Sequence, residues 1–254
     1  MRVLLRLWRR GSKRCRQQLG NGECFAAPRS KGGKAAVLAL HVAPGIVAAL
    51  LLRHARMPLM RLLGLSSSTV QIVVIMTGAI MLAALTGGTF LLARHWDGLR
   101  VRAAMRCLGL TSFDPVALVM AVAAWGVLVV FPFDGIRELI AVGVGKVPWL
   151  ALPPWHFQAY AAFEQIPRPA AAFALVANIM GEELWFRGYL QNKLSFLGSS
   201  TWVWAGLLFT AYHVFQAPIS YPNFAGALAL SGLYALRRDL WACVLLHTLL
   251  QAPV

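Results

Sequence analysis

Long apolar runs separated by short basic segments dominate the chain. The runs lie at residues 35–52, 69–93, 115–133, 169–190, 201–217, 222–236 and 240–253. Most are close to the length that crosses the hydrocarbon layer of a membrane, about 20 helical residues. Because apolar and polar residues do not alternate within them, they predict helices and not the strands of a membrane barrel. The pattern therefore predicts an all-α fold, a polytopic transmembrane helical bundle of about seven membrane helices, in the range of roughly six to eight.

Residues 134–168 interrupt this pattern. Three charged residues break the apolar stretch and three prolines prevent a regular helix: Arg137, Glu138, Lys146, Pro148, Pro153 and Pro154. We interpret the segment as interfacial, with a further tilted span as the alternative.

Composition agrees with residence in a membrane. Apolar residues make up 59% of the chain and charged residues 13%, against about 25% charged residues in soluble domains. The net charge of +15 comes from basic residues in the segments between apolar runs. That placement indicates membrane topology, so membrane lipids are expected as partners and nucleic acid is not.

The chain begins with a basic segment. Residues 1–34 contain ten Lys or Arg residues and one acid, Glu23, which predicts a cytoplasmic arm. By the positive-inside rule, the N-terminus and the segments after the second, fourth and sixth runs lie in the cytoplasm. Those segments carry Arg94, Arg100, Arg102, Arg106, Arg187, Lys193, Arg237 and Arg238. Arg53, Arg56 and Arg61 would lie on the opposite side.

The four cysteines, Cys15, Cys24, Cys107 and Cys243, are scattered and form no CxxC pair. Their spacing indicates neither a disulfide framework nor a thiolate metal site.

Ionisable residues inside the last apolar runs mark a candidate site, because each costs several kcal/mol in a membrane. Glu182 and Glu183 are adjacent, and Arg187 follows Glu183 by four residues, so Glu183 and Arg187 can pair on one helix face. Glu182 points elsewhere without that cation, which suits a general base.

Two later runs carry a histidine each. Residues four apart lie on one helix face, so Phe209 is expected beside His213, and Gln251 beside His247. Counting residues from the helix ends places Glu182 and His247 about 10 to 12 Å deep and His213 about 18 Å deep. An ordinary ion pair and isolated interhelical hydrogen bonds would explain each position alone, whereas one shared site explains them together.

These residues resemble the motifs of the CPBP or Abi family of intramembrane proteases, which includes the type II CAAX prenyl proteases. The family motif EExxxR corresponds to Glu182, Glu183 and Arg187, FxxxH to Phe209 and His213, and HxxxN to His247 and Gln251. The resemblance covers about residues 165–254, and residues 35–164 match only as generic membrane helices. Gln251 departs from the usual Asn, keeping the amide but lengthening the side chain by one methylene group.

The resemblance implies an endopeptidase that hydrolyses a peptide bond of a membrane-associated or lipidated substrate. Glu182 and His213 would activate a water, while His247 and Gln251 would hold the oxyanion. Glu183, Arg187 and Phe209 would support them. It also implies a bacterial cytoplasmic membrane and no cofactor or metal. A glutamate and two histidines are also a possible zinc set, although Gln is a poor metal ligand.

Two other functions stay open at this point. The first is a non-catalytic membrane scaffold or bacteriocin self-immunity protein with the same fold, which Gln251 favours. The second is a small transporter in which Glu and His residues relay protons.

Overall fold

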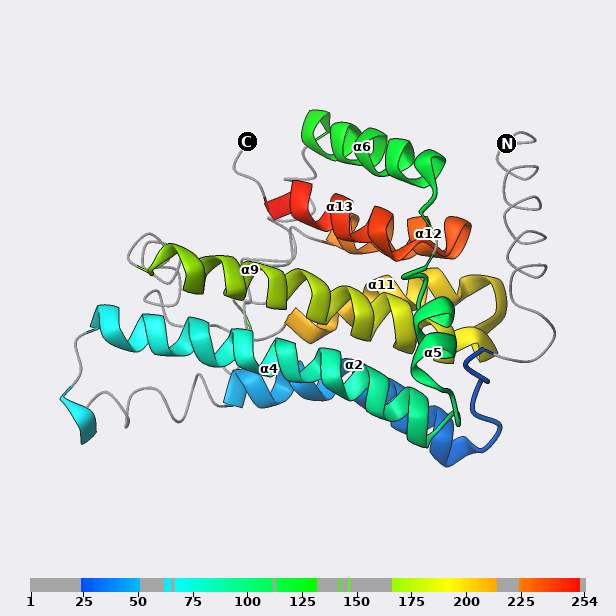
Figure 1. Ribbon diagram of the computed structural model, residues 1–254, viewed down its shortest axis with the longest axis horizontal. Coiled ribbons are helices and arrows are strands. Elements are labelled where there is room, and N and C mark those ends of the chain that lie inside the picture. Colours follow the sequence, from blue (N-terminus) through cyan, green and yellow to red (C-terminus); the bar gives the residue numbers. More distant parts are fainter. Residues whose placement is uncertain are drawn as a thin grey trace.

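The helices of the protein follow its apolar runs. A computed structural model (Figure 1) describes residues 24–50, 62–64, 67–111, 113–131, 142, 146, 166–213 and 224–251. The seven longer helices are α2 (Lys31–Leu50), α4 (Ser67–His95), α6 (Pro115–Val130), α9 (Arg168–Glu182), α11 (Thr201–Tyr212), α12 (Phe224–Arg237) and α13 (Leu240–Gln251). Each coincides with one predicted run, which confirms the helical class. Most of the predicted interfacial segment, 134–168, lies outside the described residues.

Shorter helices join these elements. They are α5 (Val101–Cys107), the π-helix η3 (Glu183–Leu190), α10 (Gln191–Lys193) and the 3₁₀-helix η4 (Leu194–Ser200). The sequence predicts neither α5 nor the π-helix. It indicates a single α-helix over residues 169–190 instead.

Among the described residues, three helical stretches are long and apolar enough to cross a membrane: Lys31–Leu50, Ile72–His95 and Arg168–Tyr212. The helices α6, α12 and α13 are apolar but shorter. The third stretch is not straight, because Gly198 adopts a non-helical φ of 63° inside η4, shortly before α11 begins. A left-handed conformation of this kind favours glycine, and it separates α11 from α9. The protein is therefore an integral membrane protein with a helical bundle.

The π-helix η3 lies at the centre of the bundle. It contacts α2, α4, α11, α12 and α13. Around it, α4 packs on α9, α11 lies between α2 and α12, and α13 contacts both α12 and α6. Figure 1 shows α6 at one edge, beyond α13, with α4 and α2 at the opposite edge.

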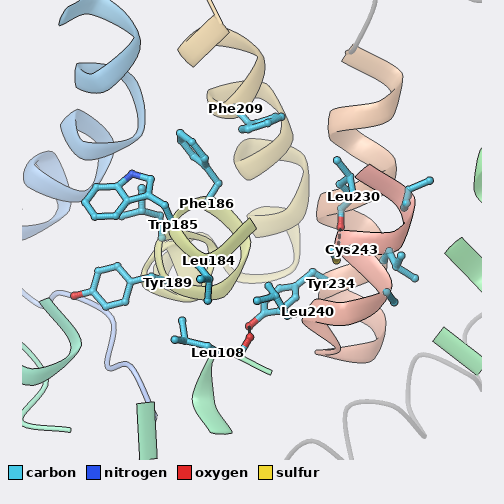
Figure 2. Close-up of a cluster of buried hydrophobic side chains, with 14 of the residues drawn as sticks. Leu108, Leu184, Trp185, Phe186, Tyr189, Phe209, Leu230, Tyr234, Leu240 and Cys243 are labelled. Carbon is cyan, nitrogen blue, oxygen red and sulfur yellow. Dashed lines mark hydrogen bonds between the residues drawn. The ribbon is translucent and has the colours of Figure 1, made fainter. Parts of the chain in front are cut away.

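All eight residues of η3 are buried. Figure 2 shows how they spread: Trp185, Phe186 and Tyr189 point in different directions from the helix. A π-helix closes each turn with an i→i+5 hydrogen bond. Its turn is therefore wider, and its side chains can contact more of the surrounding helices. This makes η3 the core of the bundle as well as the carrier of Glu183 and Arg187.

Basic and aromatic residues gather at one end of the bundle. This end holds the start of α2, α6, α11 and α13 and the end of α4 and α12. Its exposed tryptophans are Trp96, Trp202, Trp204 and Trp241. Tryptophan is enriched where a membrane meets water, so these side chains mark one membrane interface.

Ion pairs tie the connections together at this end. Lys193 pairs with Asp97, and Arg237 pairs with Asp114. Asp114 also caps α6, accepting hydrogen bonds from the backbone N–H groups of Val116 (3.0 Å) and Ala117 (3.4 Å). The α12–α13 connection is thereby fixed to the start of α6.

The expectation of no disulfide is wrong. Cys24 and Cys107 are joined, with their Cα atoms 5.4 Å apart and a sequence separation of 83. Next to this bond, the ring of Phe25 packs edge-on against Tyr189, with centroids 4.9 Å apart. The chain just before α2 is therefore attached to both α5 and η3. The pairing depends on contacts between distant segments, which cysteine spacing does not report.

Candidate active site

The two adjacent glutamates lie at the junction of α9 and η3. Glu182 is the last residue of α9 and Glu183 the first of η3, and their side chains are 3% and 0% exposed. The helix changes from α to π geometry at this point, and π segments frequently occur at functional sites. Both carboxylates point into the bundle.

Glu183 is held by two cationic or donor groups. The Nδ1 of His247 donates to its Oε1 over 2.7 Å, and Nη1 of Arg187 lies 3.4 Å from the same oxygen. The guanidinium also stacks over Phe209, with Cζ 3.6 Å from the ring centroid. The predicted Glu183–Arg187 pair forms, but Arg187 is only 1% exposed. Its predicted place among the cytoplasmic cations is therefore wrong, because its side chain turns inward to the site.

Glu182 lies between two histidines. Its Oε1 is 3.7 Å from Nε2 of His213, and its Oε2 is 3.8 Å from Nε2 of His247. Both separations exceed a direct hydrogen bond, and a water molecule commonly bridges polar groups at such distances. The structure thus brings together the glutamate and both histidines from α9, α11 and α13.

Each histidine has one ring nitrogen already engaged. The Nδ1 of His213 lies 2.8 Å from the backbone oxygen of Phe209. A carbonyl oxygen can only accept, so Nδ1 carries the proton and Nε2 faces Glu182 as an acceptor in the neutral ring. The ring of Phe209 packs edge-on to His213, with centroids 4.5 Å apart, so the predicted neighbours are adjacent.

His247 has its two nitrogens on different partners. Because Nδ1 donates to Glu183, Nε2 accepts in the neutral ring, and the amide nitrogen of Gln251 lies 3.1 Å from it. Gln251 is exposed at the end of α13. The predicted His247–Gln251 neighbours are therefore also in contact.

Glu182 and His213 lie at similar depths, contrary to the expectation that His213 lies deeper. Helical residues continue past the predicted end to Lys193, eleven residues after Glu182 (193 minus 182). His213 follows the start of α11, Thr201, by twelve residues (213 minus 201). The two counts nearly match, and the expected difference came from ending the glutamate helix too early.

Sequence reasoning missed two buried residues near the site. His41 on α2 is 0% exposed, and its ring centroid lies 6.1 Å from that of Phe186. An ionisable residue inside a membrane helix is the signal that could have found it. Tyr212 is also 0% exposed, and its ring centroid lies 4.7 Å from that of His213. Its position directly before His213 in the sequence could have indicated that it lies near the site.

The described residues contain no group of three or more His, Cys, Asp or Glu side chains arranged to hold a metal ion. The Nε2 of His247 already contacts the Gln251 amide, and an amide nitrogen is a donor and not a metal ligand.

Comparison with known proteins supplies one match. Residues 165–252 match the family described as type II CAAX prenyl endopeptidase, Rce1-like. No curated protein and no solved structure matches the chain significantly. The matched residues contain every member of the candidate site.

Proposed function

From the Rce1-like identity of residues 165–252, we propose that the protein is an intramembrane endopeptidase that uses a glutamate- and histidine-activated water. The observation that carries this proposal is the position of Glu182 between the Nε2 atoms of His213 and His247, at 3.7 and 3.8 Å. A carboxylate and an imidazole at this spacing suit the activation of water.

Water would be held between Glu182 and His213. The two atoms that face each other, Oε1 of Glu182 and Nε2 of His213, are both acceptors. One water molecule can therefore donate a hydrogen bond to each, through its two protons. Glu182 takes one of these protons as the water oxygen attacks the peptide carbonyl carbon. The same proton then passes to the amide nitrogen as the C–N bond breaks, which leaves a carboxylic acid and an amine.

His247 and Gln251 would stabilise the oxyanion. His247 can donate from Nε2 only when its ring is protonated, because Nδ1 donates to Glu183. Glu183 holds Nδ1 of His247, and Arg187 in turn pairs with Glu183, so the imidazole ring is kept oriented toward the site. A protonated Nε2 of His247 cannot accept from the Gln251 amide, so both N–H donors of that amide are then available to the oxyanion.

We further propose a hydrophobic or lipidated, membrane-tethered peptide as the substrate. The support is the membrane setting of the site, together with the CAAX-processing family of the matched residues. The basic and tryptophan-rich end of the bundle favours a cytoplasmic N-terminus in a bacterial cytoplasmic membrane.

The decisive test is cleavage of a lipidated or hydrophobic reporter peptide by purified protein. Glu182→Gln keeps the shape of the side chain but removes the base, so kcat should fall by about 10²- to 10⁴-fold. Ser231→Ala is the matched control, because Ser231 is equally buried but lies on α12 away from the glutamates. Equal cleavage by wild type and Glu182→Gln would overturn the proposal.

Addition of a chelator separates the metal-free scheme from the zinc alternative. Unchanged cleavage supports the hydrogen-bonded site, and loss that zinc restores contradicts it.

One observation favours a second function, a scaffold or self-immunity protein of the same fold. Gln251 is exposed and replaces the shorter Asn of the family motif, which places the oxyanion donor differently. If the cellular phenotype is the same for Glu182→Ala and wild type at equal expression, that function replaces the endopeptidase.

A further inference from the structure

A proline inside α2 leaves one backbone carbonyl without its helical donor. Pro44 lies within the helix Lys31–Leu50. Because proline has no backbone N–H, the i→i+4 hydrogen bond to the Leu40 carbonyl oxygen is missing. The helix is long and apolar enough to cross a membrane, where lipid offers no water to satisfy a freed carbonyl. Neighbouring helices commonly supply the donor in such cases.

The donor comes from the π-helix η3. Nε1 of Trp185 donates to the Leu40 carbonyl oxygen over 3.3 Å, and Trp185 is 5% exposed. In Figure 2 the indole lies beside the blue ribbon of α2. The helix α4 also runs close to the ring, because a Cβ atom on Gly88 would lie 3.4 Å from its Cζ3 atom. The indole is thus buried where η3 meets α2 and α4.

Trp185 belongs to the turn of η3 that carries the site. It follows Glu183 by two residues and precedes Arg187 by two, and these two residues form the buried ion pair of the site. The next residue, Phe186, faces His41 on α2, with ring centroids 6.1 Å apart. Two successive residues of η3 therefore contact α2, a helix outside the family-matched segment.

We propose that Trp185 is a positioning residue for the candidate site, because its bond to the Leu40 carbonyl holds the η3 turn between Glu183 and Arg187 against α2. Pro44 frees the acceptor, and the indole N–H occupies it. This inference rests on the proposed function for its catalytic meaning, whereas the bond itself can be tested without catalysis. The helix α2, which carries none of the three motifs, thereby supports the site.

A double-variant cycle in thermal unfolding tests the bond. Pro44→Ala returns a backbone N–H to α2, which can donate to the Leu40 carbonyl in place of the indole. Trp185→Phe leaves this carbonyl unsatisfied when Pro44 is present but not when it is replaced. Tm in detergent should therefore fall by more in the wild-type background than in Pro44→Ala. Equal falls in both backgrounds would mean that only ring packing is lost, and they overturn the inference.

Trp241→Phe is the matched control for this cycle. Nε1 of Trp241 also donates to a backbone carbonyl, that of Leu110, over 2.9 Å, but both residues lie outside α2. The effect of Trp241→Phe on Tm should be the same with and without Pro44→Ala. If Pro44→Ala weakened the effects of both tryptophan changes alike, the pairing of Trp185 with the freed carbonyl would be refuted.

Peptide-cleavage kinetics test the positioning role. Loss of one neutral hydrogen bond should lower the kcat of Trp185→Phe by about 2- to 10-fold, with KM nearly unchanged. The assay is run well below the Tm of the variant, so a purely structural loss leaves kcat as in wild type. Trp241→Phe, which loses a similar bond away from the glutamates, should keep the wild-type kcat.

The two measurements separate this inference from the proposed function. Unchanged kcat for Trp185→Phe, or an equal fall for Trp185→Phe and Trp241→Phe, overturns the positioning role even where the Tm cycle confirms the bond. If the wild-type protein cleaves no peptide, the proposed function fails, and the Tm cycle alone decides whether Trp185 holds η3 to α2.

Discussion

At the scale of single residues, the site depends on how the two nitrogens of each histidine are used. Nδ1 of His213 is committed to a backbone carbonyl and Nδ1 of His247 to Glu183. Both Nε2 atoms therefore face the space around Glu182. Partners behind the rings set which nitrogen carries the proton, which is a common device for fixing histidine chemistry.

Gln251 provides the sharpest residue-scale prediction. Gln251→Leu keeps the approximate size but removes the amide that lies 3.1 Å from His247. If this amide stabilises the oxyanion, kcat should fall by about 10²- to 10³-fold, with KM nearly unchanged.

Peptide-cleavage kinetics measure the effect of Gln251→Leu, with Gln251→Asn as the control that keeps an amide. Asn should retain more activity than Leu. Equal losses for Leu and Asn would indicate that the length of the side chain matters and the amide does not.

Sequence spacing predicted the local neighbours of the site well. Glu183 with Arg187, Phe209 with His213, and His247 with Gln251 are each four residues apart, and helical geometry alone brings such pairs together. Tyr212 and His41 were missed because their contacts with Phe186, which bring them near the site, come from another helix. Contacts of that kind depend on packing, which spacing along one helix does not determine.

At the scale of secondary-structure elements, the apolar runs predicted the positions of the long helices but not their internal geometry. A run of apolar residues indicates the length of a buried segment, but it does not distinguish an α-helix from a π-helix. The π geometry of η3 accompanies contacts to five surrounding helices, so it could not be inferred from residues 183–190 alone.

Close packing between α2 and α11 yields a prediction for Gly45. Gly45→Ala would place a Cβ atom 1.8 Å from the Tyr212 carbonyl oxygen, so one of the helices must move. Overpacking of this kind costs about 1 to 3 kcal/mol. Thermal unfolding in detergent should show a lower Tm, and the cleavage rate should fall because His213 follows Tyr212.

Gly126→Ala is the control for Gly45→Ala. Gly126 lies inside α6, and a Cβ atom there would meet nothing within 4 Å. This change should leave Tm equal or higher, since alanine favours helix by about 1 kcal/mol over glycine. A Gly45→Ala variant as stable as Gly126→Ala would contradict the close packing.

The ion pair of Asp114 and Arg237 predicts a dependence of stability on pH. Burial alone would raise the pKa of Asp114, but Arg237 and the N–H groups of Val116 and Ala117 lower it below the ordinary 3.8. A lowered pKa in the folded state contributes stability above the unfolded value. That stability is lost as the pH falls through 3.8 and below.

Tm measured between pH 6 and pH 3 tests this ion pair in wild type and Arg237→Met. Wild type should lose more stability over this range than the variant, because the variant lacks the cation that holds Asp114 ionised. Parallel curves for the two proteins would rule out a contribution from the pair.

At the scale of the whole molecule, the N-terminal helices α2 and α4 pack against the matched segment, residues 165–252, which carries the candidate site. The motifs all lie within residues 165–252, yet α2 and α4 both contact η3. Residue patterns identified the motif-bearing third of the chain, whereas they described the rest only as membrane helices. The structure shows that α2 and α4 pack against the segment that carries the candidate site.

The disulfide predicts a dependence of stability on redox conditions. A cross-link of Cys24 to Cys107 restricts the unfolded chain over 83 residues, and such bonds typically contribute about 2 to 4 kcal/mol. Reductant should therefore lower the Tm of wild type and leave that of Cys24→Ser unchanged. Identical Tm values for wild type with and without reductant would contradict this prediction.

The same two cysteines report on orientation in the membrane. They lie at the basic end of the bundle, which the positive-inside rule assigns to the cytoplasm, where thiols are normally kept reduced. Because the structure joins Cys24 to Cys107, trapping of thiols in intact cells tests this assignment: a bond that forms only after cell lysis in air would support a cytoplasmic end. A pair found already oxidised in cells would instead indicate that this end faces an oxidising compartment.

The π-helix has a consequence for how this part of the chain tolerates changes in length. A widened turn accommodates about one residue more than an α-helix does over the same rise, so η3 behaves like an α-helix that has gained a residue. Deleting one residue between Glu183 and Arg187 would allow ordinary helical phase to return. Arg187 would then follow Glu183 by three residues instead of four, while every motif letter outside the gap stayed the same, and a comparison of sequences that ignores gaps would overlook the change.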